Sequence, residues 1–235
     1  MRHLIKALNR VKYLWARTSA KRYEVFLKKK GISIGSNIFW GKIKTIEIDY
    51  SRPLLVEIGD NVRLNTGLTL LTHDASTQVF RNLFHDFLSS SGRIKIGNNV
   101  YFGRHCTVLK GVEIGDNCII GYGSIVTKSI PANSVAVGRP AKVISSIEDY
   151  YKKRKQVALE EAFEYARIIY KKTGRKPTIA EMYEEFPFYL DGNAPDPGLK
   201  LSVAYQTRGF YEEWKQSHKA PFASFDEFLK AAGIE

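Results

Sequence analysis

His73 is the residue of this 235-residue chain best suited to chemistry near neutral pH. It lies in the tripeptide Thr72-His73-Asp74. An ordinary imidazole is largely neutral near physiological pH, so it can accept a proton from a weak nucleophile and return that proton later in a reaction. The carboxylate of Asp74 is of a type that can orient a histidine or contact a substrate. These residue types make His73 a candidate general base and Asp74 a candidate for orienting a histidine or contacting a substrate, although a histidine considered alone is more often structural.

A six-residue repeat predicts the elements that position His73. Large apolar residues recur every six positions, with glycine after several of them, in the series Ile34, Trp40, Ile46, then Ile58, Leu64, Leu70, then Ile96, Phe102, Val108, Ile114, Ile120, Val126. An amphipathic helix would place its apolar residues three and four apart, and a plain strand would alternate them. The spacing instead predicts a solenoid of about four or five triangular coils, in which each hexapeptide supplies one short strand and one turn.

The repeat is interrupted directly after the strand that leads to His73. Leu70 and Ile96 are 26 residues apart, which is not a multiple of six. We therefore expect residues 72–93 to leave the coil as an extruded loop, with His73 at its root. Long loops on rigid scaffolds often carry function.

The positive charge is concentrated at the N-terminus. The chain has a formal net charge of +12, and residues 1–30 hold ten Lys or Arg against one acid. A nucleic-acid partner is not expected, because it would require a basic stripe on the folded body. Leu4, Leu8, Val11 and Trp15 recur at helical spacing between basic residues, which predicts an amphipathic helix. That helix either caps the open end of the coil or contacts an anionic membrane surface, and the two roles are compatible.

The composition places the chain among ordinary globular proteins of the cytoplasm. It is 44% hydrophobic and 26% charged, which excludes disorder as a whole-chain interpretation. No run of eighteen apolar residues and no secretory signal is visible. The two cysteines are too few for a disulfide scaffold and fit a reducing compartment. We expect a cytoplasmic protein, with peripheral contact at the inner face of the cell membrane as the alternative offered by the basic N-terminal helix.

A helical extension is predicted after Ile147, where the six-residue repeat stops. Helices are expected from Tyr150 to Lys172, from Thr178 to about Phe186, over 204–217 and over 224–232. Abundant aromatic residues favour a packed module over a loose tail. The predicted domains are thus a basic helical arm over 1–30, the coil over 31–147 and the α-helical extension over 148–235.

Two segments resemble a known family. Residues 96–144 contain the motifs VTKSIP and GRPAKVI, and residues 51–76 end in the THD motif before the loop. They resemble the hexapeptide-repeat acetyl-CoA-dependent O-acetyltransferases, in particular the maltose/galactoside acetyltransferase group and the enzymes that acetylate capsular or other surface polysaccharides. The resemblance implies a mainly β fold, namely a left-handed parallel β-helix. It also implies a homotrimer, with His73 of one chain facing coenzyme held partly by the next.

The resemblance also implies site residues. Acetyl-CoA would be the acetyl donor, and the positions matching its binding residues are Gly103, Arg104, Gly121, Tyr122, Thr127, Lys128 and Lys142. Lysine and phosphate form charge-assisted pairs, although Lys128 and Lys142 would also be unremarkable as solvated cations. Candidates for the sugar site are Asp49, Asn65, Asp74, Arg81, Asn82 and Tyr101. No metal site is expected, because the histidines lack the five-residue spacing that the metal-binding branch of this fold uses.

The predicted function is transfer of acetyl from acetyl-CoA to a sugar hydroxyl of a surface polysaccharide or its precursor. An N-acetyltransferase acting on an amino sugar, free or nucleotide-linked, is the alternative among enzymes. A non-catalytic β-helix scaffold is the alternative of another class. Intact THD, VTK and PAKVI segments favour an enzyme, since a scaffold has no need of a coenzyme groove.

Overall fold

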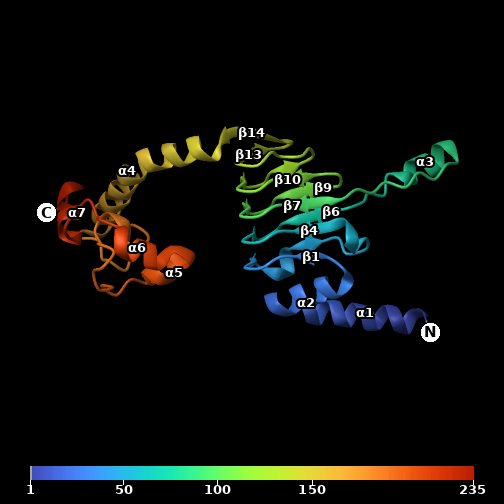
Figure 1. Ribbon diagram of the computed structural model, residues 1–235, viewed down its shortest axis with the longest axis horizontal. Coiled ribbons are helices and arrows are strands. Elements are labelled where there is room, and N and C mark those ends of the chain that lie inside the picture. Colours follow the sequence, from blue (N-terminus) through green and yellow to red (C-terminus); the bar gives the residue numbers. More distant parts are fainter. Residues whose placement is uncertain (1) are drawn as a thin grey trace. The chain divides into compact units, whose positions relative to one another are not determined.

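The computed structural model describes the backbone of residues 2–235 and the side chains of residue 8 and of residues 10–235. The contacts divide the chain into two units, 1–151 and 152–235. The first unit contains a coil of parallel strands with two helices at its N-terminal end, and the second is helical (Figure 1).

Residues 33–126 form four stacked coils of three short strands each. The strands are β1 (Ser33–Ile34), β2 (Phe39–Trp40) and β3 (Glu47–Ile48), then β4 (Val56–Ile58), β5 (Arg63–Leu64) and β6 (Thr69–Leu71), then β7 (Ile94–Ile96), β8 (Tyr101–Phe102) and β9 (Thr107–Leu109), then β10 (Glu113–Ile114), β11 (Ile119–Ile120) and β12 (Ile125–Val126). Each strand pairs in parallel with its counterpart in the next coil, which gives three sheets, β1-β4-β7-β10, β2-β5-β8-β11 and β3-β6-β9-β12. The coil is therefore a three-sided prism.

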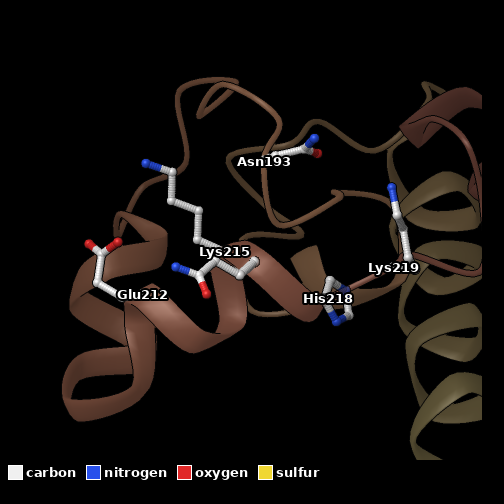
Figure 2. A pocket seen from close by; sticks show the side chains of 6 residues that line it. Asn193, Glu212, Lys215, His218 and Lys219 are labelled. Atoms are coloured by element: carbon white, nitrogen blue, oxygen red, sulfur yellow. The ribbon is translucent and has the colours of Figure 1, made fainter.

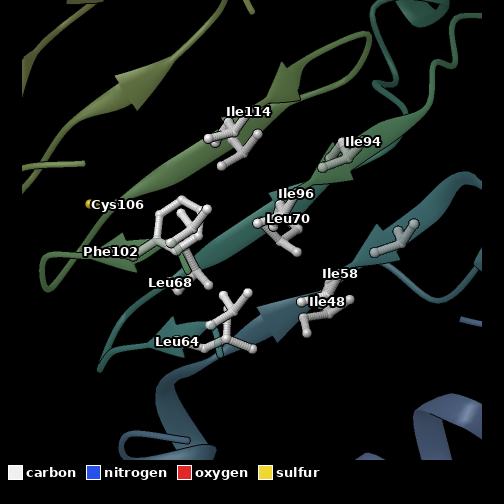
Figure 3. Packing of buried hydrophobic residues seen from close by; sticks show 14 of the residues in the cluster. Ile48, Ile58, Leu64, Leu68, Leu70, Ile94, Ile96, Phe102, Cys106 and Ile114 are labelled. Atoms are coloured by element: carbon white, nitrogen blue, oxygen red, sulfur yellow. The ribbon is translucent and has the colours of Figure 1, made fainter. Parts of the chain in front are cut away.

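The interior of the prism is filled by the apolar residues of the six-residue repeat (Figure 3). Ile58 pairs with Ile96, and Leu70 pairs with Val108. Like side chains therefore stack in columns along the axis, and the side chains of Leu64, Leu70 and Phe102 are completely buried. Each coil buries its apolar residues only against its neighbours, so the coils stabilise one another.

One corner of the prism explains the repeated Ile-Gly-polar-Asn pattern. Asn61, Asn99 and Asn117 all have φ near +55°, a left-handed conformation that asparagine tolerates better than most residues. Their side chains form a ladder, in which Asn99 Nδ2 donates to Asn117 Oδ1 at 2.9 Å. At Gly59 a Cβ would lie 2.7 Å from the backbone of Gly97, so a side chain there would push the coils apart.

The first coil departs from the predicted frame. The strand residue that pairs with Leu70 is Ile48, whereas the six-residue count placed Ile46 in that position. The 3₁₀ turn η1 (Ile43–Thr45) widens the corner by two residues, and Ile46 fills the smaller inward position before the strand. This shift has a consequence for chemistry, because it places Asp49 directly after β3.

Residues 72–93 leave the prism between β6 and β7. They contain helix α3 (Thr77–Phe84), which projects away from the sheets (Figure 1). At the root of this segment His73 and Ser91 form an antiparallel bridge, and Gly92 N–H donates to the carbonyl of Thr72. The two ends of the excursion are therefore held together at the prism.

Two helices lie at the N-terminal end of the coil. They are α1 (Arg2–Ala16) and α2 (Ala20–Lys30), the second capped by the Ser19 hydroxyl and ended by left-handed Gly31. Tyr23 and Leu27 of α2 belong to the same buried cluster as the coil interior. The guanidinium of Arg17 donates to the carbonyls of Ile43 and Ile46, both at 3.0 Å. These contacts satisfy backbone groups that the first coil presents at its end.

At the other end of the coil the strands change direction. β13 (Ser134–Gly138) pairs in parallel with β11, and β14 (Ala141–Ser146) then returns antiparallel to β13. Helix α4 (Ile147–Thr173) follows at once, three residues earlier than expected, and the boundary between the two units falls within it.

The second unit packs around aromatic residues. Its remaining elements are η3 (Phe186–Phe188), α5 (Val203–Thr207), η4 (Arg208–Phe210), α6 (Tyr211–Ser217) and α7 (Phe225–Ala231). Phe186, Trp214 and Phe228 are buried in its core. Helix α7 agrees with the expected helix over 224–232 and is capped by Ser224.

Two helix predictions in this unit are wrong. Residues 178–185 form turns rather than a helix, and Pro187 disfavours α-helical backbone at the residue before it. The Glu181 carboxylate accepts hydrogen bonds from the N–H and hydroxyl of Thr178. The helix expected over 204–217 is broken at Arg208, which has φ of +41° and precedes Gly209. Glycine is a poor helix former.

Within residues 2–235, no helix combines the length and apolar character needed to cross a membrane.

Candidate active site

His73 and Asp49 form a close pair at one edge of the prism. Asp49 follows β3 and His73 follows β6, and these two strands are neighbours in one sheet. His73 Nδ1 lies 2.5 Å from Asp49 Oδ2. The Asp49 side chain is 8% exposed and that of His73 is 39% exposed. The carboxylate is thus enclosed, whereas the ring reaches the surface.

Hydrogen bonds hold Asp49 in its ionised form. Burial alone would raise the pKa of this carboxyl, but hydrogen bonds from Thr72, Ser51 and His73 outweigh burial and hold its pKa well below the usual range. The Thr72 hydroxyl donates to Oδ2 at 2.5 Å, and the hydroxyl and N–H of Ser51 donate to Oδ1 at 2.7 and 3.0 Å. Both oxygens of the carboxylate are therefore engaged.

An ionised Asp49 decides the tautomer of His73. A carboxylate only accepts hydrogen bonds, so Nδ1–H of His73 must be the donor. The neutral ring then carries its lone pair on Nε2. The negative charge beside Nδ1 also stabilises the ring once Nε2 has accepted a proton. The arrangement therefore leaves Nε2 as the ring nitrogen that can accept a proton.

Asp74 is adjacent to His73 in the sequence, but its carboxylate contacts other residues. Its carboxylate accepts hydrogen bonds from Ser76, from Ser90 at 2.8 Å, and from the ammonium of Lys110 on the next coil. The Lys110 contact, followed by the two serines, holds the pKa of Asp74 below its usual range. Asp74 thus ties the two ends of the loop to the coil, and Asp49 is the carboxylate at the His73 ring.

The residues expected at the coenzyme site lie on two edges of the prism. Gly103, Arg104, Gly121 and Tyr122 occupy the turns that precede β9 and β12. Tyr122 is 72% exposed, and a Cβ at Gly103 would lie 2.5 Å from the Tyr122 backbone nitrogen. Only glycine lets the two turns approach this closely.

Thr127 and Lys128 lie on the other edge, after β12, two coils from His73, which follows β6 of the same sheet. Lys142 lies on β14, opposite Val137. The two edges are separated by a strand and its flanking turns, about 20 Å of extended chain. In one chain, therefore, the structure brings His73 onto the same edge as Thr127 and Lys128, and leaves the Gly103 and Gly121 turns on another.

The remaining residues predicted for the sugar site are dispersed. Asn65 lies on the edge of the Gly103 turn, and its Nδ2 donates to the carbonyl of Phe102 at 2.7 Å. Arg81 and Asn82 are exposed on α3. Tyr101 lies on the outer face of its sheet and is 43% exposed. Of these candidates only Asp49 and Asp74 lie beside His73 in the same chain.

A separate pocket lies in the second unit and is lined by polar side chains, with Asn193, Glu212, Lys215 and Lys219 around His218 (Figure 2). The His218 ring stacks on Trp214, and its Nε2 donates to the carbonyl of Pro187 at 2.8 Å. The ring of His218 is thus engaged by stacking and its Nε2 by a hydrogen bond, and we do not assign catalysis to this pocket.

Sequence reasoning missed Ser51 and Thr72 as partners of Asp49, and Lys110 as the partner of Asp74. A signal existed for Ser51, because an aspartate followed two residues later by serine often forms a local turn in which the carboxylate binds the serine. No comparable signal links Lys110 to Asp74, since that contact depends on the stacking of coils. Among the described residues, no group of three His, Cys, Asp or Glu side chains could hold a metal ion.

Comparisons with known proteins match the coil. The model of the bacterial transferase hexapeptide family (six repeats) matches residues 93–128. The galactoside O-acetyltransferase of Escherichia coli (strain K12) is 43% identical over 123 residues, which are 50% of this chain and 55% of that protein. This chain therefore spans about half the length of that relative. A solved galactoside acetyltransferase in complex with coenzyme A is 30% identical, with 62% of this chain and 82% of that chain covered and a TM-score of 0.48.

A second relative is matched over most of its length. Protein CapG of Staphylococcus aureus is 37% identical over 124 residues, which are 53% of this chain and 71% of that protein. Residues 93–128, which match the family model, lie within the stacked six-residue repeats. This chain belongs to the hexapeptide-repeat transferase family.

Proposed function

We propose that this protein transfers acetyl from acetyl-CoA to a sugar hydroxyl, with His73 as the general base. The observation that carries the proposal is the pair of His73 with the ionised Asp49, since this arrangement leaves a basic nitrogen at the surface. Support for the acetyl group and the sugar comes from the E. coli relative, whose name is galactoside O-acetyltransferase.

His73 would move one proton through the reaction. Nε2 accepts the proton of the sugar hydroxyl as the hydroxyl oxygen attacks the thioester carbonyl carbon. The carbon–sulfur bond of the resulting tetrahedral intermediate then breaks, and Nε2 returns the proton to the sulfur. The products are an acetyl ester and a free thiol. The Asp49 carboxylate stabilises the protonated ring between these two steps.

Arg104 is our candidate donor to the thioester oxyanion. Its neighbours Gly103 and His105 both use their N–H groups to pair with another coil, bonding the carbonyls of Ile120 and Thr66. Among the described residues no such backbone bond is found for the Arg104 N–H. One donor of this kind can contribute about 3 kcal/mol to the stabilisation of the transition state.

A homotrimer would bring the two edges together. His73 of one chain would then face coenzyme held by Gly103, Arg104, Gly121 and Tyr122 of the next. The separation of these edges in a single chain supports this arrangement. Thr127, Lys128 and Lys142 would meet the nucleotide end of the coenzyme, where lysine is suited to phosphate.

We further propose that the acceptor is a surface polysaccharide or its precursor and that the reaction takes place in the cytoplasm, with peripheral membrane contact through residues 1–30. Exposed Arg81 and Asn82 on α3, with Asp74 at its root, remain our candidates for acceptor contacts. An N-acetyltransferase would prefer an amino sugar to its hydroxyl analogue when both are offered side by side. A scaffold would bind no coenzyme in a direct titration.

The first experiment is thiol release from acetyl-CoA against a panel of glycans, with wild type beside His73→Ala. We expect glycan-dependent release that falls at least about a hundredfold in the variant, the range of general base catalysis. His85→Ala, a histidine at the end of α3 and outside the pair, is the matched control. Unchanged release in His73→Ala would overturn the assignment of the base.

A further inference from the structure

Helix α1 exposes an apolar face on the side away from the coil. Leu8, Val11, Leu14 and Trp15 are each between 52% and 63% exposed. Their spacing of three, three and one residues places them on one side of the helix. Four large apolar side chains on one exposed helix face are unusual for the surface of a water-soluble unit.

The opposite side of α1 is already used for packing. Ala16 is buried, and Tyr13 packs on the core cluster and against the rings of Phe26 and Tyr50, with centroids 5.7 and 5.2 Å away. Burial of the coil end is therefore achieved by Tyr13 and Ala16 together with Tyr23 and Leu27 of α2. The exposed face of α1 is not needed to cap the coil.

Positive charge surrounds the exposed face. Arg10 and Lys12 flank it on α1, and Lys21, Arg22 and Lys28–Lys30 follow on α2. The one acid of residues 1–30, Glu24, is occupied by Lys28 at 2.8 Å and by the indole N–H of Trp40 at 3.1 Å. This excess of positive charge favours a negatively charged partner over an uncharged apolar one.

Trp15 combines both properties at the edge of the face. The guanidinium of Arg22 lies 4.8 Å from the centre of its ring, while 59% of the side chain remains exposed. Tryptophan and arginine side by side suit the boundary between lipid head groups and acyl chains, where one side of the contact is apolar and the other is charged.

We infer that the outer face of α1, namely Leu8, Val11, Leu14 and Trp15, docks on a membrane surface rich in anionic lipid. The four apolar side chains enter the acyl boundary, and the basic residues of α1 and α2 contact the head groups. This inference deepens the peripheral membrane contact through residues 1–30 that is part of the proposed function, and it rests on the proposed function in that respect alone. It does not depend on acetyl transfer.

The test is co-sedimentation of the full-length protein with vesicles, in the absence of any substrate. Vesicles of phosphatidylglycerol and phosphatidylcholine are compared with pure phosphatidylcholine at low and high salt. One variant carries Val11→Gln, Leu14→Gln and Trp15→Gln, since glutamine preserves helix propensity. A second carries Lys12→Gln, Lys21→Gln and Lys29→Gln. The control carries Val143→Gln and Ile144→Gln, which are exposed apolar residues of β14 at the other end of the coil.

We expect wild type and control to bind the anionic vesicles and to be released by salt, because screening weakens surface charge. The apolar variant should lose at least about tenfold in partitioning, and the lysine variant should bind weakly with little salt dependence. Equal binding of the apolar variant and wild type would overturn the inference. So would equal binding to neutral and anionic vesicles, or a change of oligomeric state in the apolar variant, which would make the face a contact between chains. None of these outcomes depends on acetyl transfer.

Discussion

Asparagine at position 49 would keep the shape of the side chain and remove its charge. Its amide can also turn its NH₂ group toward Nδ1 of His73, which would place the ring proton on Nε2 and block that nitrogen as a base. We expect Asp49→Asn to lower turnover by roughly a hundredfold or more with little change in coenzyme affinity. Ser51→Ala removes one hydrogen bond to the same carboxylate and serves as the milder control. The measurements are kcat and a coenzyme-binding titration, and wild-type turnover in Asp49→Asn would remove Asp49 from the mechanism.

The same carboxylate predicts how stability depends on pH. Its pKa is lower in the folded protein than the value of about 3.9 for an unfolded chain, so its ionised form is favoured by folding. This contribution is complete above the unfolded pKa and is lost as the pH falls through the lower folded pKa. The difference in unfolding free energy between wild type and Asp49→Asn should therefore shrink as the pH falls from about 5 to about 3. Denaturant titrations at pH 5, 4 and 3 measure it, and a difference that grows toward acid over this range would contradict this account.

Sequence alone could find His73 but not its partner. His73 lies in a short motif beside a break in the repeat, both of which are local signals. Asp49 is 24 residues away, and its contact depends on the pairing of β3 with β6. The two-residue widening at η1 shifts that pairing from Ile46 to Ile48, and the six-residue count contains no information about it. Asp74 appeared closer to the chemistry only because it is adjacent in the chain.

At the scale of the element, the left-handed asparagines provide a test of the corner geometry. Asn117 has φ of +56°, and its side chain accepts a hydrogen bond from Asn99 and donates one to Asn133, both at 2.9 Å. Asn117→Ala should cost about 1–2 kcal/mol of unfolding free energy from the backbone conformation, in addition to the lost side-chain bonds. Asn117→Gly keeps the backbone relaxed and loses only the bonds, so it should cost less. Chemical denaturation of the two variants separates the contributions, and equal losses would assign the effect to the ladder alone.

Strands could be predicted from the sequence where the six-residue repeat recurs in coil after coil. The helices of the second unit, whose sequence does not repeat, were predicted less well. Each residue of the frame from Ile58 to Val126 is buried as expected, because every coil restates the same spacing. The second unit offers no such redundancy. It forms turns over 178–185, and its break at Arg208 depends on a single residue of positive φ, which helix propensity does not predict.

At the scale of the whole molecule, a site shared between chains predicts complementation. His73→Ala removes the base, and the double variant Arg104→Glu and Tyr122→Glu places negative charge on the exposed coenzyme edge. Each variant should be inactive alone. Each mixed trimer should restore one of its three sites, about a third of the wild-type number, because a restored site takes His73 from one variant and the intact edge from the other.

Co-expression with two different affinity tags, followed by tandem purification, isolates the mixed assemblies for the turnover assay. Assembly of both mutations on one chain, mixed with an intact chain of measured activity, controls for unrelated effects of mixing. Mixed assemblies that form and stay inactive would place the complete site within one chain.

The stacking of coils also sets a scale along the prism axis. The third and fourth coils are 18 residues apart, from Ile96 to Ile114, and each coil adds about 4.8 Å of height. His73 leaves the second coil, while Gly103 and Gly121 belong to the third and fourth. Insertion of one coil between the second and the third would repeat the same strand pairing and increase their axial separation by one whole step. The number of coils therefore fixes the axial distance between His73 and the turns at Gly103 and Gly121. A change in the number of coils can alter that distance only in steps of one coil height.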